Sequence, residues 1–159
     1  MKGNDKVIVL LNEFLADELT AISQYMVHSE MCANWGYERL HKAVEKRAID
    51  EMKHAEKLIG RILFLEGDPD MSPKSFEQGR SVEEMLKKDL ALEYEVREKL
   101  AMGIALCERL GDYVSREMLR VQLSDTEEDH TYWLEQQLSI IQRIGMERYQ
   151  LSKLDAKSP

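Results

Sequence analysis

The chain has 159 residues and a formal net charge of −8 at neutral pH, with 43% hydrophobic and 33% charged residues. This length suits one ordinary domain with a substantial core, and the presence of only 8 glycines and 3 prolines favours long uninterrupted helices. The acidic balance argues against nucleic acid as a partner, because phosphate binding requires a basic surface.

The expected cellular location follows from three further features of the sequence. No apolar run approaches the roughly 20 residues needed to span a bilayer, and the amino terminus is not typical of a signal peptide. The two cysteines, Cys32 and Cys107, lie far apart and lack the spacing of a redox or metal-binding pair. We therefore expect buried free thiols in a reducing compartment, in a cytoplasmic protein that has no membrane partner.

Hydrophobic periodicity predicts two long helices in the first half of the chain. The first covers about 5–34 and ends before Gly36, and the second covers about 38–66 and ends at the breaker sequence Gly67-Asp68-Pro69. The polar segment 67–81 that follows is interpreted as a crossover loop. Together these elements form one helical hairpin and a long connection.

The second half of the chain repeats this pattern. Ser81 and Glu84 resemble a capping box, which marks the beginning of a third helix over about 82–110. A fourth helix covers about 113–144, and a short fifth one is expected at about 147–153. Two helical hairpins joined by a long connection predict an all-α four-helix bundle, with the whole chain, 1–159, as a single domain.

A Glu-x-x-His pattern occurs once in each half, as Glu51 with His54 and as Glu127 with His130. A glutamate and a histidine three residues apart lie about 60° from each other on one helical face. Each pair can therefore direct a carboxylate and an imidazole to the same point.

One further glutamate on the preceding helix accompanies each pair, Glu18 before the first and Glu93 before the second. All six residues fall on apolar stripes of their predicted helices, where a charge is costly to bury unless it is paired or ligated. Four carboxylates and two imidazoles form the ligand set of a carboxylate-bridged di-iron or di-manganese site in a four-helix bundle. Glu51 and Glu127 are expected to bridge the two metals, and Glu18 and Glu93 each to cap one.

Helical phase selects Glu93 from among its acidic neighbours. Glu95 and Glu98 lie about 200° and 140° away from it around the helix, so both are expected to face solvent. Glu93 itself falls between Leu90 and Leu100 on the buried stripe.

Several longer segments carry a family signature. They are the opening MKG, Glu18-Leu19, SQY at 23–25, Asn34-Trp35-Gly36, IDEMKHAEKLIGRILFLEG at 49–67, DLALE at 89–93, DYVSR at 112–116, and EEDH at 127–130 followed by WLE. In these segments the chain resembles the bacterioferritins over nearly its full length. The resemblance implies a ferritin-like four-helix bundle, ferroxidase activity that oxidises Fe(II) to Fe(III) with O2 or hydrogen peroxide, and iron storage as mineral inside a hollow 24-mer shell.

The resemblance also implies a haem b shared between two subunits, with the sulfur of Met52 from each subunit as a ligand of its iron. The position suits this role, since Met52 lies about 100° around the helix from Glu51 and points toward a neighbour. The apolar haem pocket would be lined by Leu19, Ile22, Met26 and Ile49. In the family this haem passes electrons inward for iron release, often from a small ferredoxin.

Two aromatic residues and one departure from the family pattern complete the expected site. Tyr25 lies two turns after Glu18 and resembles the family tyrosine beside the metals, which implies that it supplies an electron during oxidation. Trp133 is a second candidate for that role. Some relatives carry a histidine in place of Lys46, where with Asp50 it helps an inner-surface iron site. A lysine is a poor metal ligand at neutral pH. The sequence therefore leaves undecided whether iron is transferred by that route.

The sequence leaves a second function open, a small soluble di-iron redox enzyme without mineral storage, such as a rubrerythrin-like peroxidase. Rubrerythrins usually add a CxxC-bearing module that this sequence lacks. A third reading, a helical bundle that serves only as an interaction module, is disfavoured by the duplicated ligand set. Assembly into a shell, with like copies or with a sister subunit, would distinguish storage from a small enzyme.

Overall fold

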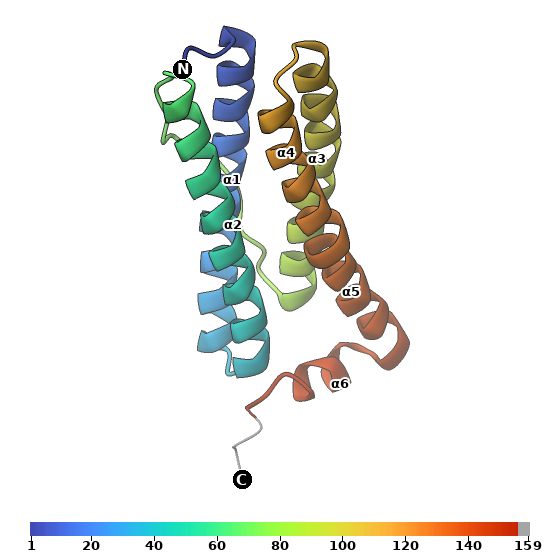
Figure 1. Ribbon diagram of the computed structural model, residues 1–159. Helices are drawn as coiled ribbons and strands as arrows, with labels where there is room; N and C mark the ends of the chain where they lie inside the picture. The colour runs from blue at the N-terminus through green and yellow to red at the C-terminus, as the bar shows by residue number, and fades with distance from the viewer. Residues whose placement is uncertain (156–159) are drawn as a thin grey trace.

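The computed structural model describes residues 1–155, and every regular element in that range is helical (Figure 1). Four long helical rods lie side by side, and the short helix α6 crosses below one end of them. The rods are α1 (Asp5–Asn34), α2 (Glu38–Phe64), α3 (Val82–Arg109), and a fourth built from α4 (Tyr113–Asp125), η1 (Thr126–Thr131) and α5 (Tyr132–Ile144). The predicted all-α four-helix bundle is confirmed, and α6 (Met146–Leu151) is the short fifth helix.

Local sequence accounts for where the rods begin and end. The hydroxyl of Ser81 accepts a hydrogen bond from the amide of Glu84 at 3.2 Å, at the beginning of α3. The predicted capping box is only half formed, because the carboxylate of Glu84 binds the amide of Arg80 instead. Gly36 and Gly145 have φ angles of +88° and +85°, a conformation that residues with a side chain rarely adopt, and α1 and α5 end beside them.

The segment 65–81 carries the chain from the end of α2 to the beginning of α3 at the opposite end of the bundle (Figure 1). It is fastened to α1 at three successive levels, by Asp70 with Asn12 at 2.8 Å, Lys74 with Asp17 at 2.5 Å, and Gly79 with His28 at 2.9 Å. The segment is therefore the predicted crossover, and it makes α2 and α3 run in the same direction.

A layer of polar side chains divides the hydrophobic core into two clusters. One cluster includes Leu11, Phe14, Leu58, Leu100 and Leu119. The other includes Tyr25, Leu40, Leu86, Leu134 and Ile141. On the first three rods, the buried residues that fall between the clusters include Glu18, Glu51 and Glu93. The bundle thus surrounds a charged centre with apolar packing on both sides.

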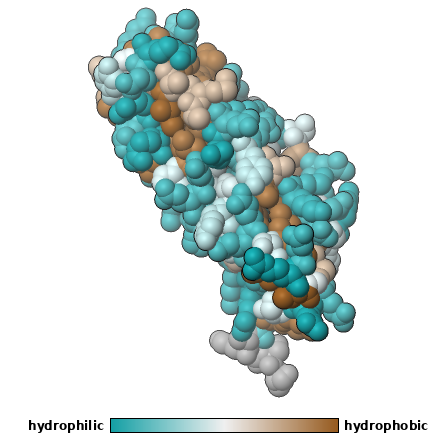
Figure 2. All heavy atoms as spheres, turned by 90° about the vertical axis from the view of Figure 1, so that its right-hand side faces the viewer, coloured by the Kyte–Doolittle hydropathy of each residue, from teal (hydrophilic) through white to brown (hydrophobic). Residues whose placement is uncertain are grey.

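The two cysteines are buried, as the sequence predicts. Cys32 and Cys107 are buried free thiols, and burial raises the pKa of the first to about 12 and of the second to about 11, so neither is a reactive thiolate. None of the described helices is long and apolar enough to cross a membrane. The face seen in Figure 2 is largely hydrophilic, with hydrophobic atoms gathered in narrow strips.

Candidate metal centre

Five of the six predicted ligands converge in the polar layer, and each has at most 5% of its surface exposed: Glu18, Glu51, His54, Glu93 and His130. They form two overlapping groups that share Glu51. Glu18, Glu51 and His54 make one group, and Glu51, Glu93 and His130 make the other. Within each group the donor atoms lie within 4.8 Å of one another, as a pair of adjacent metal sites with a common carboxylate requires.

The two oxygens of Glu51 face one imidazole each. Its Oε2 lies 3.3 Å from Nδ1 of His54, and its Oε1 lies 2.8 Å from Nδ1 of His130. On the outer side, Nδ1 of His54 lies 3.7 Å from Glu18, and Nδ1 of His130 lies 3.1 Å from Glu93. The arrangement is nearly symmetric about Glu51, as expected from the repeated sequence pattern.

The charged groups of the cluster shift one another's pKa values. Burial opposes a charged imidazole, but hydrogen bonds to the neighbouring glutamates outweigh it and raise the pKa of both His54 and His130 to about 11. Burial and the charge of Glu51 raise the pKa of Glu18 well above its usual range and that of Glu93 to about 7. Burial also acts to raise the pKa of Glu51, but its hydrogen bonds hold that pKa well below the usual range. A bound metal ion would displace several of these protons.

Glu127 is the one predicted ligand that lies outside the cluster. Its side chain is 48% exposed, and its Oε2 lies 3.1 Å from Nε of Arg97. The expectation that all six residues occupy buried faces is wrong for Glu127, while its role as a ligand stays a prediction. The physical reason is that η1 is a π-helical turn, in which the wider i→i+5 turn separates residues three apart by a larger angle than in an α-helix. His130 therefore turns inward and Glu127 outward.

Tyr25 belongs to the cluster directly. It is fully buried, its hydroxyl donates a hydrogen bond to Oε1 of Glu93 at 2.5 Å, and its ring meets His130 edge-on at 6.1 Å. Burial and the charge of Glu93 raise the pKa of Tyr25 well above its usual value, so the phenol keeps its proton. Trp133, in contrast, packs beneath the guanidinium of Arg47 at 3.8 Å.

Met52 and its expected neighbours lie on the outer faces of α1 and α2. Met52 is 46% exposed, and Met26 and Ile49 are similarly exposed, whereas Leu19 and Ile22 are half-buried. Met52 thus points away from the metal cluster, as its angle from Glu51 predicts.

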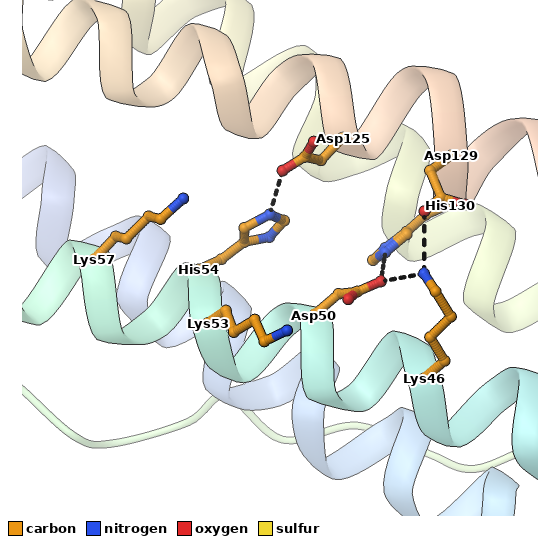
Figure 3. Close-up of a pocket in the computed structure, with 8 residues that line it drawn as sticks. All are labelled: Lys46, Asp50, Lys53, His54, Lys57, Asp125, Asp129 and His130. Atoms are coloured by element: carbon orange, nitrogen blue, oxygen red, sulfur yellow. Dashed lines mark hydrogen bonds and ion pairs between the residues drawn. The ribbon is translucent and has the colours of Figure 1, made fainter.

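A cavity of about 180 Å³ opens beside the cluster, between α2 and the fourth rod (Figure 3). His54 and His130 form part of its wall, and three lysines of α2 line one side. One of them, Lys46, lies 2.9 Å from Asp50 and 3.4 Å from Asp129, so its ammonium group neutralises carboxylates at this opening. Lys46 therefore places a positive charge at the mouth of the site.

Two further residues contact the cluster and were missed in the sequence. Gln122 is buried and donates a hydrogen bond to Oε1 of Glu18 at 2.5 Å. Asp125, half exposed, contacts Nε2 of His54 at 2.9 Å. Gln122 lies about one turn after Leu119 on the apolar stripe, and this spacing could have predicted that its side chain is buried. No comparable feature of the sequence predicts the contact of Asp125.

Comparison with known proteins finds relatives over nearly the full length of the chain. The ferritin-like domain family matches residues 8–144. A bacterial ferritin of Pseudomonas aeruginosa is 49% identical over 154 residues, and one of Neisseria meningitidis is 47% identical over the same length; each match covers 97% of this chain and 100% of the relative. A bacterioferritin of Brucella melitensis is 44% identical over 150 residues, which are 94% of this chain and 92% of the relative.

Proposed function

The chain belongs to the ferritin family, whose bacterial members store iron, and on that premise we propose that it is a ferroxidase. It oxidises Fe(II) to Fe(III) at the paired site and keeps the product as mineral inside a closed shell. All 159 residues act as one ferritin-like domain of that shell. The observation that carries this proposal is the pair of buried donor groups joined by Glu51.

The donor set fits iron. Hard carboxylate oxygens with one imidazole at each site suit Fe(II), Fe(III) and manganese. Oε2 of Glu18 is buried and accepts no hydrogen bond from any described residue. A buried carboxylate oxygen without a partner is expected where a metal ion would bind. Glu18 with His54 would hold one iron, Glu93 with His130 the other, and Glu51 would bridge them.

Iron is the substrate of this reaction, and two Fe(II) ions bound together supply the electrons that reduce O2 or hydrogen peroxide. The apolar residues on both sides of the cluster limit the access of water. The carboxylates neutralise part of the charge of the bound ions. The hydroxyl oxygen of Tyr25 lies 2.5 Å from Oε1 of Glu93, so the phenol can give an electron to the site while its proton passes to that carboxylate. Glu127 completes the ligand set by turning inward from Arg97.

A haem b between two subunits is the second part of the proposal. The sulfur of Met52 suits an axial ligand, because the side chain is 46% exposed on the outer face of α2, and the apolar side chains of Met26 and Ile49 are 55% and 43% exposed. Such a haem would carry electrons from a small ferredoxin toward the mineral, where reduction releases iron. Met52 is the single residue of this chain that would hold the haem iron.

The proposed shell is a 24-mer of like chains, with a sister subunit as a possible second component, in the cytoplasm. Large apolar side chains such as Leu63, Met102 and Val114 are 58–73% exposed in the single chain. Contacts between subunits would remove this apolar surface from water.

The decisive experiment is to measure the iron that the protein retains. Apoprotein is loaded aerobically with excess Fe(II), passed over a desalting column, and assayed for iron and protein. Tens of irons per subunit are expected for mineral storage. About two per subunit would instead indicate a small di-iron redox enzyme, and none would overturn the metal site itself.

A further inference from the structure

The two imidazoles of the metal centre have the same orientation. Each directs Nδ1 inward to the buried glutamates. Each directs Nε2 outward to an aspartate on the opposite helix (Figure 3). Nε2 of His54 on α2 lies 2.9 Å from Oδ2 of Asp125, at the end of α4. Nε2 of His130 in η1 lies 3.2 Å from Oδ2 of Asp50 on α2. The histidine of α2 thus contacts an aspartate of the fourth rod, and the histidine of the fourth rod contacts an aspartate of α2.

This geometry has a consequence for metal binding. A neutral imidazole that binds a metal through Nδ1 must carry its remaining proton on Nε2. A carboxylate that accepts the hydrogen bond of Nε2–H selects that tautomer, holds the ring in place and increases the basicity of Nδ1. The outer aspartates therefore favour the one form of each ring that can serve as a ligand.

We infer that Asp125 and Asp50 are positioning residues of the metal centre, each of which fixes its histidine with Nδ1 free for the metal. The inference rests on the proposed metal site and deepens it. The two residues are not equivalent. Among the described residues, the Asp125 carboxylate has His54 as its hydrogen-bond partner, whereas the Asp50 carboxylate, besides its histidine, also accepts a hydrogen bond from Lys46 at 2.9 Å. The charge of Asp50 is thus shared, and Asp125 should have the larger effect.

The same cavity supplies a matched control in Asp129. Its side chain is 49% exposed, against 50% for Asp125, and it carries the same charge. Its hydrogen bonds go to Lys46 and Arg47, both at 3.4 Å, and none goes to a histidine. Replacing Asp129 changes the local potential of the cavity and removes one carboxylate of the donor group that it forms with Asp50 and His130, but it removes no hydrogen bond to an imidazole.

The test compares Asp125→Asn, Asp50→Asn and Asp129→Asn in the assembled protein. Asparagine can donate its amide to Nε2 and so favour the tautomer with a proton on Nδ1, which blocks the metal. Titration with Co(II), followed by its visible absorption, gives both the affinity and the number of sites. We expect affinity to fall about 10–100-fold for Asp125→Asn, less for Asp50→Asn, and less than about twofold for Asp129→Asn.

Two further measurements separate positioning from structural damage. Asp125→Glu restores a carboxylate and should recover most of the Co(II) affinity, and the melting temperature of each apoprotein variant should match that of the Asp129→Asn control. Equal affinities for Asp125→Asn and Asp129→Asn, with the original protein binding two Co(II) per subunit, would overturn the positioning role alone. Failure of the original protein to bind Co(II) would overturn it together with the metal site.

Discussion

Nε of Arg97 lies 3.1 Å from Oε2 of Glu127, and this ion pair between α3 and η1 keeps the carboxylate on the outside of the bundle. His130, three residues further on, is 1% exposed. The π-helical turn thus separates two residues that an α-helix would have placed on one face. The sixth ligand of the proposed site is therefore held outside the cluster that its five partners form.

Replacing Arg97 with glutamine should favour the inward position of Glu127. The ion pair is exposed and therefore weak, so we expect only a few-fold rise in Co(II) or Mn(II) affinity, measured by titration of the apoprotein. Arg120→Gln is the control, because it breaks an equally exposed ion pair with Glu117 at 2.9 Å. Identical affinities in the two variants would show that Arg97 does not restrain a ligand.

Replacing Glu51 with alanine should abolish rapid iron oxidation while the shell still assembles. This change removes the carboxylate that both donor groups share, so we expect the rate to fall by more than the 10–100-fold typical of outer-shell partners. The formation of Fe(III) is followed by its absorbance under air, and assembly by size-exclusion chromatography. Glu56→Ala, at an exposed position on the same helix, should oxidise iron normally. An unchanged rate in Glu51→Ala would show that iron is not oxidised at the proposed site.

The same assay tests Glu127. If this residue turns inward to bind iron, Glu127→Ala should also lose rapid oxidation, and Arg97→Gln should not. Normal oxidation by Glu127→Ala would leave a five-residue ligand set.

The stability of the apoprotein should decrease as the pH rises from about 6.5 to 9. The pKa of His54 and of His130 is about 11 in the folded protein, against 6.5 for a free side chain. Between these values the folded state binds more protons than the unfolded chain, so the contribution of the two histidines to stability, fully present below pH 6.5, is progressively lost as the pH rises. Glu93, with its pKa raised to about 7, acts in the same direction below that pH.

Melting temperatures of the apoprotein across this range check the prediction. Saturating Mn(II) should reduce or reverse the decrease, because the metal binds the deprotonated ligands. A melting temperature that rises with pH in the absence of metal would contradict the raised pKa values of His54 and His130.

Replacing Met52 with leucine should abolish haem binding and leave iron oxidation unchanged, since the sulfur is lost and the metal cluster lies on the other face of α2. Haem is added to the apoprotein, and its absorbance is measured after gel filtration. Met102→Leu removes a more exposed methionine of α3, 73% exposed, and should bind haem normally. An unaltered haem spectrum in Met52→Leu would mean that another residue is the ligand.

Much of the site followed from periodicity within single helices. Glu93 is buried and Glu95 and Glu98 are exposed, as their angles around α3 predict, because residue spacing sets direction in a regular helix. The crossover was likewise readable, from the clustered proline, glycine and polar residues of 67–81. Glu127 was placed wrongly because the same rule was applied to a turn that is not α-helical.

The sequence by itself determined the four rods, the crossover and the chemical type of the centre, since each depends on patterns within one helix or on repeats along the chain. Only the tertiary structure decided which way the ligands face at η1 and what supports them. The pairing of Asp125 with His54 joins residues 71 positions apart, and that of Arg97 with Glu127 joins two helices. No local pattern encodes such contacts, because they exist only once packing has brought separate helices within hydrogen-bonding distance.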